Sequence, residues 1–237
     1  MSEQQQTQSR RARLREQTSA EIKAIALKLM AGGGPDAISL RAIAREMGMT
    51  AGAIYSYFPT RDDLITTLIG DVYSSAVQAA ESARDSVSES DPGARIMAWA
   101  GAMRAWALAN PEGFRLIYGD PVPGYQPPED GPGKAAELRA CTGLVGLVAA
   151  AWPSACTQHP ADHYEWADFD PGLVAHVRED FAALPPMALA VTLRVWGRMH
   201  GLMALEIYGH LRTLIHDPAT VYRDEMRDLI ASLGLTC

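Results

Sequence analysis

Residues 39–61 constrain the fold of this chain more than any other segment. Their first part, SLRAIAREMG, carries apolar residues at positions 40, 43, 44 and 47, a spacing that predicts a helix with one buried stripe. Ser39 stands where an N-cap belongs, and Gly48 can take the left-handed conformation that ends a helix. We therefore expect a short amphipathic helix followed by a tight turn at Gly48.

The second part, MTAGAIYSYFPTR, predicts another short helix, capped by Thr50. Ile54 and Phe58 are four residues apart and are expected to point inward together. The other side chains are small or aromatic and nearly uncharged, so this helix can sink deeply into a major groove. Because two short helices joined by a glycine-containing turn form a helix-turn-helix, the segment is predicted to recognise double-stranded DNA.

Here the chain resembles the TetR family of one-component transcriptional regulators. The resemblance rests on residues 43–48 (IAREMG) and 53–64 (AIYSYFPTRDDL), in roughly the first quarter of the chain. It implies a homodimer whose N-terminal three-helix domain binds a palindromic operator and whose divergent C-terminal helical domain binds a small molecule. Arg61 stands where lysine is commoner in the family; both are cations that can meet a phosphate, and arginine adds a planar fork.

These observations predict a set of DNA contacts. The predicted DNA-binding residues are Ser39, Arg41, Thr50, Ala51, Gly52, Ala53, Tyr55, Tyr57 and Arg61. Thr50, the two tyrosines and Arg61 are expected to position the domain through phosphates. Arg41 is expected to reach guanine, and Ala51 or Ala53 to meet a thymine methyl group.

Charge is distributed unevenly along the chain. Residues 1–61 contain nine Lys or Arg against five Asp or Glu, a net of +4, and the remainder contains 12 basic and 23 acidic residues, a net of −11. The overall net charge of −7 therefore hides a basic N-terminal part. This asymmetry favours a DNA-facing domain joined to an acidic body that is kept away from the phosphates.

The predicted fold class is all-α, with an N-terminal three-helix DNA-binding domain and a larger helical bundle that dimerises. We expect a flexible basic arm at 1–17, the helix-turn-helix domain at 18–63 and a ligand-binding and dimerisation domain at 64–237. Residues 10–15 (RRARLR) either extend the first helix or lie as an arm in a minor groove. Thr18–Glu21 and Thr60–Asp63 resemble capping boxes, which predicts helix starts there.

The body is predicted to be helical because strand-like alternation is absent. The helices are expected near 60–87, 92–109, 111–118, 134–151, 171–183, 186–211 and 218–233. Residues 119–133 (GDPVPGYQPPEDGPG) hold five prolines and four glycines, which predicts an irregular surface loop. This loop and a second irregular stretch at 153–170 either form the mouth of a ligand cavity or are simple connectors.

A motif near the C-terminus extends the resemblance. Trp196, His200 and Gly201 match the W-x-x-x-H-G (WHG) signature of one subclass of TetR C-terminal domains. Gly197 and Gly201 are four residues apart, which lets a second helix approach closely, either in a two-fold partner or within the chain. The predicted dimer interface, completed by the last helix as a four-helix bundle, comprises Gly197, Gly201, Ala204, Tyr222, Met226 and Leu229.

Aromatic and sulfur-containing side chains in the body share helical faces. They either line an apolar pocket for a drug-sized effector or simply fill the core. His200 is likewise a ligand contact, a dimer contact or a hydrogen-bonded core residue. The candidate ligand-binding residues are Trp99, Met103, Trp106, Phe114, Tyr118, Trp196, Met199, His200 and Met203.

Other classes of function are disfavoured. No phosphate-binding loop, nucleophile elbow or zinc-ligand spacing occurs, so we expect no enzyme, no catalytic residue, no metal site and no cofactor. Without an apolar run of about 18 residues or a signal peptide, a cytoplasmic protein with no membrane contact is expected. Two alternatives stay open: a DNA-binding repressor that needs no effector, and a helical small-molecule-binding protein with a vestigial DNA-binding head.

Overall fold

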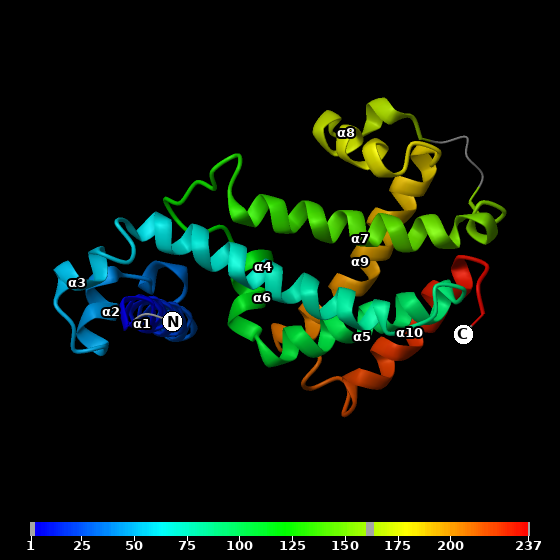
Figure 1. Ribbon diagram of the computed structural model, residues 1–237. Helices are drawn as coiled ribbons and strands as arrows, with labels where there is room; N and C mark the ends of the chain where they lie inside the picture. Colours follow the sequence, from blue (N-terminus) through cyan, green and yellow to red (C-terminus); the bar gives the residue numbers. More distant parts are fainter. Residues whose placement is uncertain (1–2, 160–163, 237) are drawn as a thin grey trace. The chain divides into compact units, whose positions relative to one another are not determined.

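The computed structural model describes residues 3–159 and 164–236, and throughout this part of the chain the regular elements are helices (Figure 1). The elements are α1 (Glu3–Gly33), η1 (Pro35–Ala37), α2 (Leu40–Glu46), α3 (Ala51–Tyr55), α4 (Arg61–Asp85), α5 (Pro92–Ala109), α6 (Pro111–Tyr118), α7 (Pro132–Ala155), η2 (Trp166–Asp168), α8 (Pro171–Asp180), α9 (Pro186–Ile207) and α10 (Pro218–Ser232). The all-α prediction is confirmed, and α5 and α6 begin and end where the sequence predicts.

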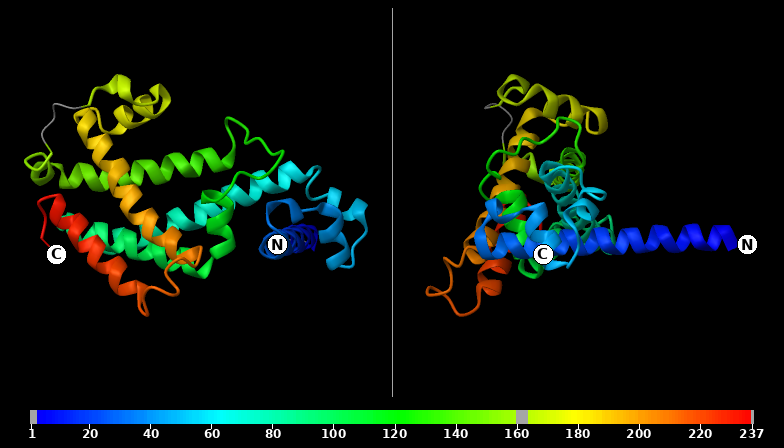
Figure 2. Two further views of the ribbon diagram at one scale, coloured as in Figure 1. Left: turned by 180° about the vertical axis from the view of Figure 1, so that it is seen from behind. Right: turned by 90° about the vertical axis from the view of Figure 1, so that its left-hand side faces the viewer.

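Helix α1 is longer than expected, because it begins at Glu3 and not near Thr18. The Thr18 hydroxyl donates to the carbonyl oxygen of Leu14 at 2.9 Å, as Ser and Thr do inside helices. The predicted capping box at Thr18–Glu21 was therefore wrong. Residues 10–15 lie within α1, which is one of the two arrangements expected for them, and Figure 2 shows α1 reaching past α2 and α3.

The chain divides into two compact units. Residues 1–72 and 112–134 form one, which we call the head, and residues 73–111 and 135–237 form the other, which we call the body. Helix α4 runs through both units. The unexpected member of the head is the segment 112–134, which lies far along the chain from the helix-turn-helix.

The head has an apolar core assembled from one stripe of each helix. Ile22 of α1, Ile43 of α2, Ile54 of α3 and Leu64 of α4 are fully buried in it. The start of α4 carries the reciprocal bonds of a capping box, as predicted. The Thr60 amide donates to Asp63 Oδ2 and the Asp63 amide donates to Thr60 Oγ1, both at 3.0 Å.

The body is built from two packed groups of helices. Helices α5, α9 and α10 contact one another. Val145, Val177 and Leu189 form an apolar cluster that joins α7, α8 and α9. Among the described residues, α7 alone is long and apolar enough to cross a membrane by length and composition, but core helices pass the same test, and α7 contributes Val145 and Val148 to the interior.

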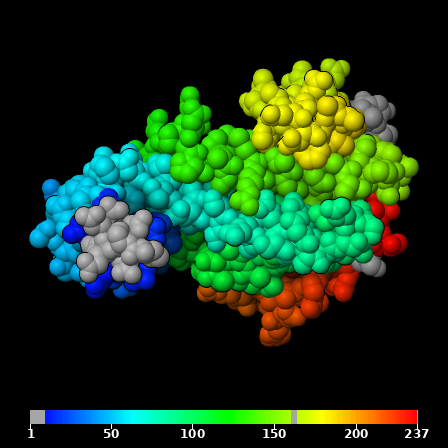
Figure 3. Space-filling model, viewed as in Figure 1, coloured from blue at the N-terminus to red at the C-terminus, as the bar shows by residue number. Residues whose placement is uncertain are grey.

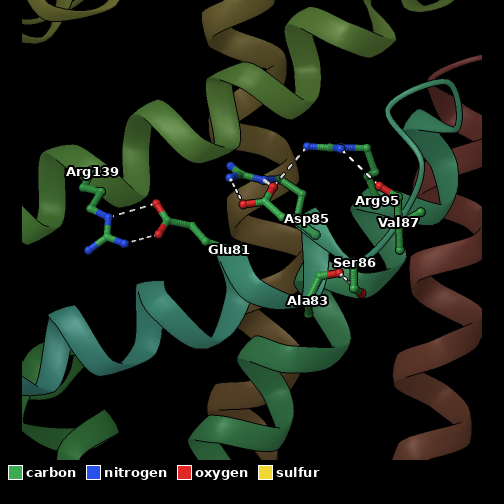
Figure 4. A network of polar contacts seen from close by, with 8 residues as sticks. Glu81, Ala83, Asp85, Ser86, Val87, Arg95 and Arg139 are labelled. Carbon is green, nitrogen blue, oxygen red and sulfur yellow. Dashed lines mark hydrogen bonds and ion pairs between the residues drawn. The ribbon is translucent and has the colours of Figure 1, made fainter.

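Ion pairs fix the C-terminal part of α4 within the body (Figure 4). Arg139 of α7 pairs with Glu81, its Nε lying 2.9 Å from Oε1. Arg84 pairs with Asp85 at 2.7 Å, and Arg95 of α5 approaches the same carboxylate at 3.3 Å. In the space-filling view, α7 and this part of α4 lie side by side along one face of the body (Figure 3).

Candidate nucleic-acid interface

The turn between α2 and α3 has the geometry that the sequence predicts. Gly48 takes φ = 64°, a conformation in which a side chain would be strained. The Met49 amide donates to the carbonyl oxygen of Ala44 at 2.9 Å and so closes the end of α2. Thr50 Oγ1 then accepts from the Ala53 amide at 3.3 Å and caps α3.

Buried anchors hold α3 in place beneath its outer face. Ile54 and Phe58 point into the core, as predicted from their spacing. Of the predicted DNA contacts, Arg41, Thr50, Ala51, Gly52 and Tyr55 are exposed, whereas Ser39, Ala53, Tyr57 and Arg61 are half-buried. Ser39 occupies the N-cap position of α2, although its side chain makes no capping hydrogen bond. The helix-turn-helix thus presents a mostly small-sided surface, beside which α2 exposes Arg41 and Arg45.

Arg15 of α1 joins this surface, a placement that the sequence did not reveal. Its guanidinium donates to the carbonyl oxygen of Ser56 at 2.7 Å and lies over the Tyr57 ring, 4.8 Å from the centroid. A cation held over an aromatic face is weakly stabilising when exposed. Arg15 therefore ties α1 to the end of α3 and adds a positive charge beside Tyr57.

Two ion pairs fasten α1 to the rest of the head. Lys28 pairs with Glu46 of α2 at 2.6 Å, and Lys23 pairs with Asp71 of α4. Since Lys28 is largely exposed, its pair contributes little to stability and mainly orients the helices.

Arg61 makes contacts that differ in kind from the phosphate contact expected of it. Its guanidinium donates to three backbone carbonyl oxygens: Nε to Ile38 at 2.9 Å, Nη2 to Pro35 at 3.1 Å and Nη1 to Pro123 at 3.4 Å. Arg61 therefore links the start of α4 to the segment that precedes α2. Its predicted phosphate contact stays a prediction.

The candidate ligand-binding residues fall into different environments. Trp99, Trp106, Met199 and Met203 are buried in the body, whereas Met103 is half-buried. The two candidates from α6, Phe114 and Tyr118, belong to the head, and their rings contact each other at a tilt of 54° with centroids 5.1 Å apart.

Trp99 is tightly surrounded within the body. Its ring edge lies 2.5 Å from where a Cβ of Gly143 would stand, and Arg84 lies over its face at 5.6 Å. Trp106 donates from Nε1 to Ser75 Oγ at 3.0 Å. Both indoles thus have packing and polar partners inside the body. Their role as ligand contacts stays a prediction.

A hollow of about 840 Å³ opens elsewhere on the surface of the body. Trp166 and Phe169 of the η2 region and Val174, Arg178 and Ala182 of the α8 region contribute to its lining. The Arg178 guanidinium lies 5.7 Å from the centroid of the Trp166 ring. Residue spacing had not singled out this hollow, because α8 is short and its outer face is mixed in polarity.

The predicted dimer residues separate into an exposed set and a buried set. Gly197 and Gly201 of α9 are exposed, and a Cβ on either would meet open space. Large apolar side chains lie exposed along the same helix, and Trp196 retains 44% of its accessible surface. These exposed side chains are Leu193, Trp196, Leu205 and Tyr208.

Tyr222, Met226 and Leu229 of α10 require a correction. They are buried in the chain's own core, and the Tyr222 hydroxyl donates to the carbonyl oxygen of Ala100 on α5 at 3.1 Å. Burial raises the pKa of the Tyr222 phenol above its ordinary value. Helices α5 and α9 both pack against α10, and within the single chain these three side chains leave almost no exposed surface for a second copy.

His200 lies half-buried on α9 beside Trp196, with ring centroids 5.5 Å apart. Burial lowers its pKa from the ordinary value of 6.5, because the charged imidazolium loses solvation. The neutral form is therefore favoured near neutral pH.

Comparisons with known proteins agree with this arrangement. Residues 22–68 match the family described as bacterial regulatory proteins of the TetR family, and residues 96–229 match the tetracycline-repressor-like C-terminal domain. The chain is 32% identical over 226 residues to the HTH-type transcriptional regulators Rv1816 of Mycobacterium tuberculosis and Mb1846 of Mycobacterium bovis. Each alignment covers 93% of this chain and 94% of the relative.

Solved structures give the same fold. The regulatory protein SCO4313 superposes with a TM-score of 0.72 and 34% identity, covering 93% of this chain and 98% of that one. The TetR family regulator PfmR of Thermus thermophilus shares the fold at 16% identity, with a TM-score of 0.59 over 90% of this chain and 98% of PfmR. The chain belongs to the TetR family of transcriptional regulators and is a DNA-binding regulator, not an enzyme.

Proposed function

We propose that this protein is a cytoplasmic repressor that binds a palindromic operator as a homodimer and is released by a small apolar or aromatic effector. The observation that carries the proposal is the helix-turn-helix of the head, in which α3 is capped by Thr50 and anchored by Ile54. Its outer face is small-sided and exposed, and Arg41 stands beside it. Such a face fits the major groove, where base edges are distinguishable.

Arg41 is the proposed base-reading residue, because it is exposed on α2 and its fork can bind guanine with two hydrogen bonds. Thr50, Tyr55 and Tyr57 would contact phosphates, which position the protein without reading sequence. Ala51 or Ala53 would meet a thymine methyl group.

Substitution of single arginines tests this division. Arg41→Ala is expected to weaken operator binding by about 5- to 150-fold and to relax the sequence preference at one position. The matched substitution Arg13→Ala, on the exposed part of α1, removes the same charge. It is expected to weaken binding to operator DNA and to scrambled DNA to a similar extent. Equal losses on both DNAs for Arg41→Ala would contradict the base-reading role.

The proposed dimer uses the exposed stripe of α9. Gly197 and Gly201 leave room for a close helix approach, and Trp196 and Leu205 supply apolar area beside them. Ala204 lies on the same face and is half-buried. The proposed interface therefore lies on α9 and no longer includes α10. We also propose that the C-terminal domain belongs to the W-x-x-x-H-G subclass. Two heads on such a dimer would have to stand about 34 Å apart to enter successive major grooves.

For an effector to release the dimer from DNA, it need only bind more tightly to the dimer with one spacing of the heads than to the dimer with the other. A difference on the order of 1–3 kcal/mol would change operator affinity by about 5- to 150-fold. We place the effector at the aromatic and methionine side chains of the body. Met103 is suited to a test, since it is half-buried and its truncation leaves the fully buried core intact.

The experiment is a screen of apolar aromatic compounds for release of labelled operator, followed by variants. Met103→Ala is expected to raise the effector concentration needed for half release, whereas Val174→Ala in the hollow near α8 is expected to leave it unchanged. The reverse result would move the effector site to the hollow. An absence of any releasing compound would favour the effector-independent repressor.

A further inference from the structure

The segment between α6 and α7 belongs to the head and packs against α4 there, although its composition predicts an irregular loop. Val122, Pro123, Gly124 and Tyr125 form a tight turn in which the Tyr125 amide donates to the carbonyl oxygen of Val122 at 3.1 Å. Gly124 has φ = 72°, and proline precedes it, which is the pattern of a type II turn. Val122 is buried, so the turn is packed against the protein and is not a free connector.

Two hydrogen bonds attach this turn to α4. The hydroxyl groups of Tyr125 and Thr66 lie 2.9 Å apart, and Arg61 reaches the carbonyl oxygen of Pro123 at 3.4 Å. The Thr66 bond is the shorter of the two and should contribute more. Together they join residues that are 59 and 62 positions apart in sequence.

Close packing extends the attachment toward α7. A Cβ on Gly70 would stand 2.7 Å from Pro132 Cβ, and a Cβ on Gly133 would stand 2.8 Å from Ile69 Cγ2. Side chains at either glycine would push the two segments apart. The loop therefore follows α4 from Arg61 to Gly70.

Arg61 connects the α6–α7 loop to the helix-turn-helix. Its two shorter hydrogen bonds go to Pro35 and Ile38, in the segment directly before the first residue of α2. The planar guanidinium offers three nitrogens in fixed directions, and each meets a different carbonyl oxygen. A lysine has one nitrogen and cannot reproduce this three-way link.

We propose that Arg61 and Tyr125 are positioning residues for DNA recognition, which clasp the α6–α7 loop to α4 and thereby hold the start of α2 in its DNA-reading position. The proposal rests on the DNA-binding function of the head and is independent of effector release. A recognition element fixed before binding loses less conformational freedom on the operator, so the clasp increases operator affinity without touching DNA.

Hydrogen exchange of the free protein tests the clasp without DNA. Tyr125→Phe removes only the hydroxyl group and is expected to speed amide exchange at least ~3-fold, in residues 119–131 and in residues 36–48. Tyr164→Phe, an exposed tyrosine in the body, is the matched control and should change neither segment. Thr66→Val combined with Tyr125→Phe should add little to either alone, because both remove the same bond.

Arg61→Lys separates positioning from phosphate contact, since it keeps the positive charge. The clasp predicts that the variant loses about 5- to 20-fold in affinity for an operator selected from random duplexes, that binding to scrambled DNA changes less than about 2-fold and that the salt dependence is unchanged. Its exchange in residues 36–48 should also rise. Wild-type operator affinity together with wild-type exchange would overturn the proposal. If the wild-type protein selects no operator, the proposed repressor function fails, and the exchange data still decide the clasp.

Discussion

The guanidinium of Arg104 donates two hydrogen bonds to the carboxylate of Glu206, at 2.8 and 2.6 Å, and so joins α5 to α9. The two side chains are only 18% and 15% exposed. Removing one partner leaves a largely desolvated charge without its counter-ion, so Glu206→Ala is expected to lower the free energy of unfolding by about 2–4 kcal/mol. Urea unfolding at fixed protein concentration measures the loss, because dimerisation makes stability concentration-dependent.

Asp224→Ala is the control for this prediction. Asp224 pairs with Arg227 at 2.8 Å, but both side chains are 60% exposed. Asp224→Ala should lower the free energy of unfolding by less than about 1 kcal/mol, because water screens the exposed pair. Equal losses for the two alanine variants would show that burial does not set the strength of these pairs.

Gly143→Ala is expected to destabilise the body, because the new methyl group would meet the Trp99 ring at 2.5 Å. Overpacking of this kind costs about 1–3 kcal/mol. Gly101→Ala on α5 meets no atom within 4 Å and should instead stabilise by about 0.5–1 kcal/mol, through helix propensity. Thermal unfolding of the two variants should therefore shift in opposite directions, and a stabilised Gly143→Ala would refute the tight contact.

Gly201→Glu tests the proposed dimer face of α9. A carboxylate at this exposed position would be buried without a partner in a close helix pair, which is strongly unfavourable. Gly101→Glu makes the same chemical change at another exposed helical glycine. Sedimentation velocity should find Gly201→Glu monomeric at concentrations where Gly101→Glu and the wild-type protein are dimers. A dimeric Gly201→Glu would place the interface elsewhere.

His200 should make stability depend on pH. Because burial lowers its pKa below 6.5, the unfolded chain binds the proton more tightly than the folded chain does. Stability is therefore lost as the pH falls through 6.5, and the loss levels off below the folded-state pKa. His200→Gln removes this contribution, so the variant should lose less stability than wild type between about pH 7.5 and 5. A difference between the two proteins that does not change with pH would contradict the assignment.

Local structure in the head was predictable from local sequence. Gly48 and Thr50 act where their chemistry favours them, at a left-handed helix end and an N-cap. The predicted cap at Thr18 failed because the same short pattern also occurs inside a helix, where the hydroxyl bonds to the preceding turn. Whether Thr18 caps a helix or lies inside one depends on whether the residues before it are helical, and here they are.

Long-range relationships were less accessible. The apolar stripe of α10 predicts burial of Met226 and Leu229 but does not say which surface covers them, and α5 of the same chain belongs to that cover. The docking of Tyr125 on Thr66 leaves no periodic signal, since it depends on two hydroxyl groups 59 residues apart. The sequence gives only the charge of Arg61, which suggests a phosphate contact. Its hydrogen bonds to Pro35, Ile38 and Pro123 join residues distant in the chain and leave no local signal.

Selection of bound sequences from a random double-stranded DNA library, at fixed physiological salt, tests whether the helix-turn-helix makes this protein a sequence-specific regulator. We expect recovery of an inverted repeat whose half-sites are centred about one helical turn, or roughly 10 base pairs, apart, as two α3 helices on a two-fold dimer require. Recovery of no motif, with only weak binding that salt abolishes, would contradict sequence-specific regulation through the helix-turn-helix.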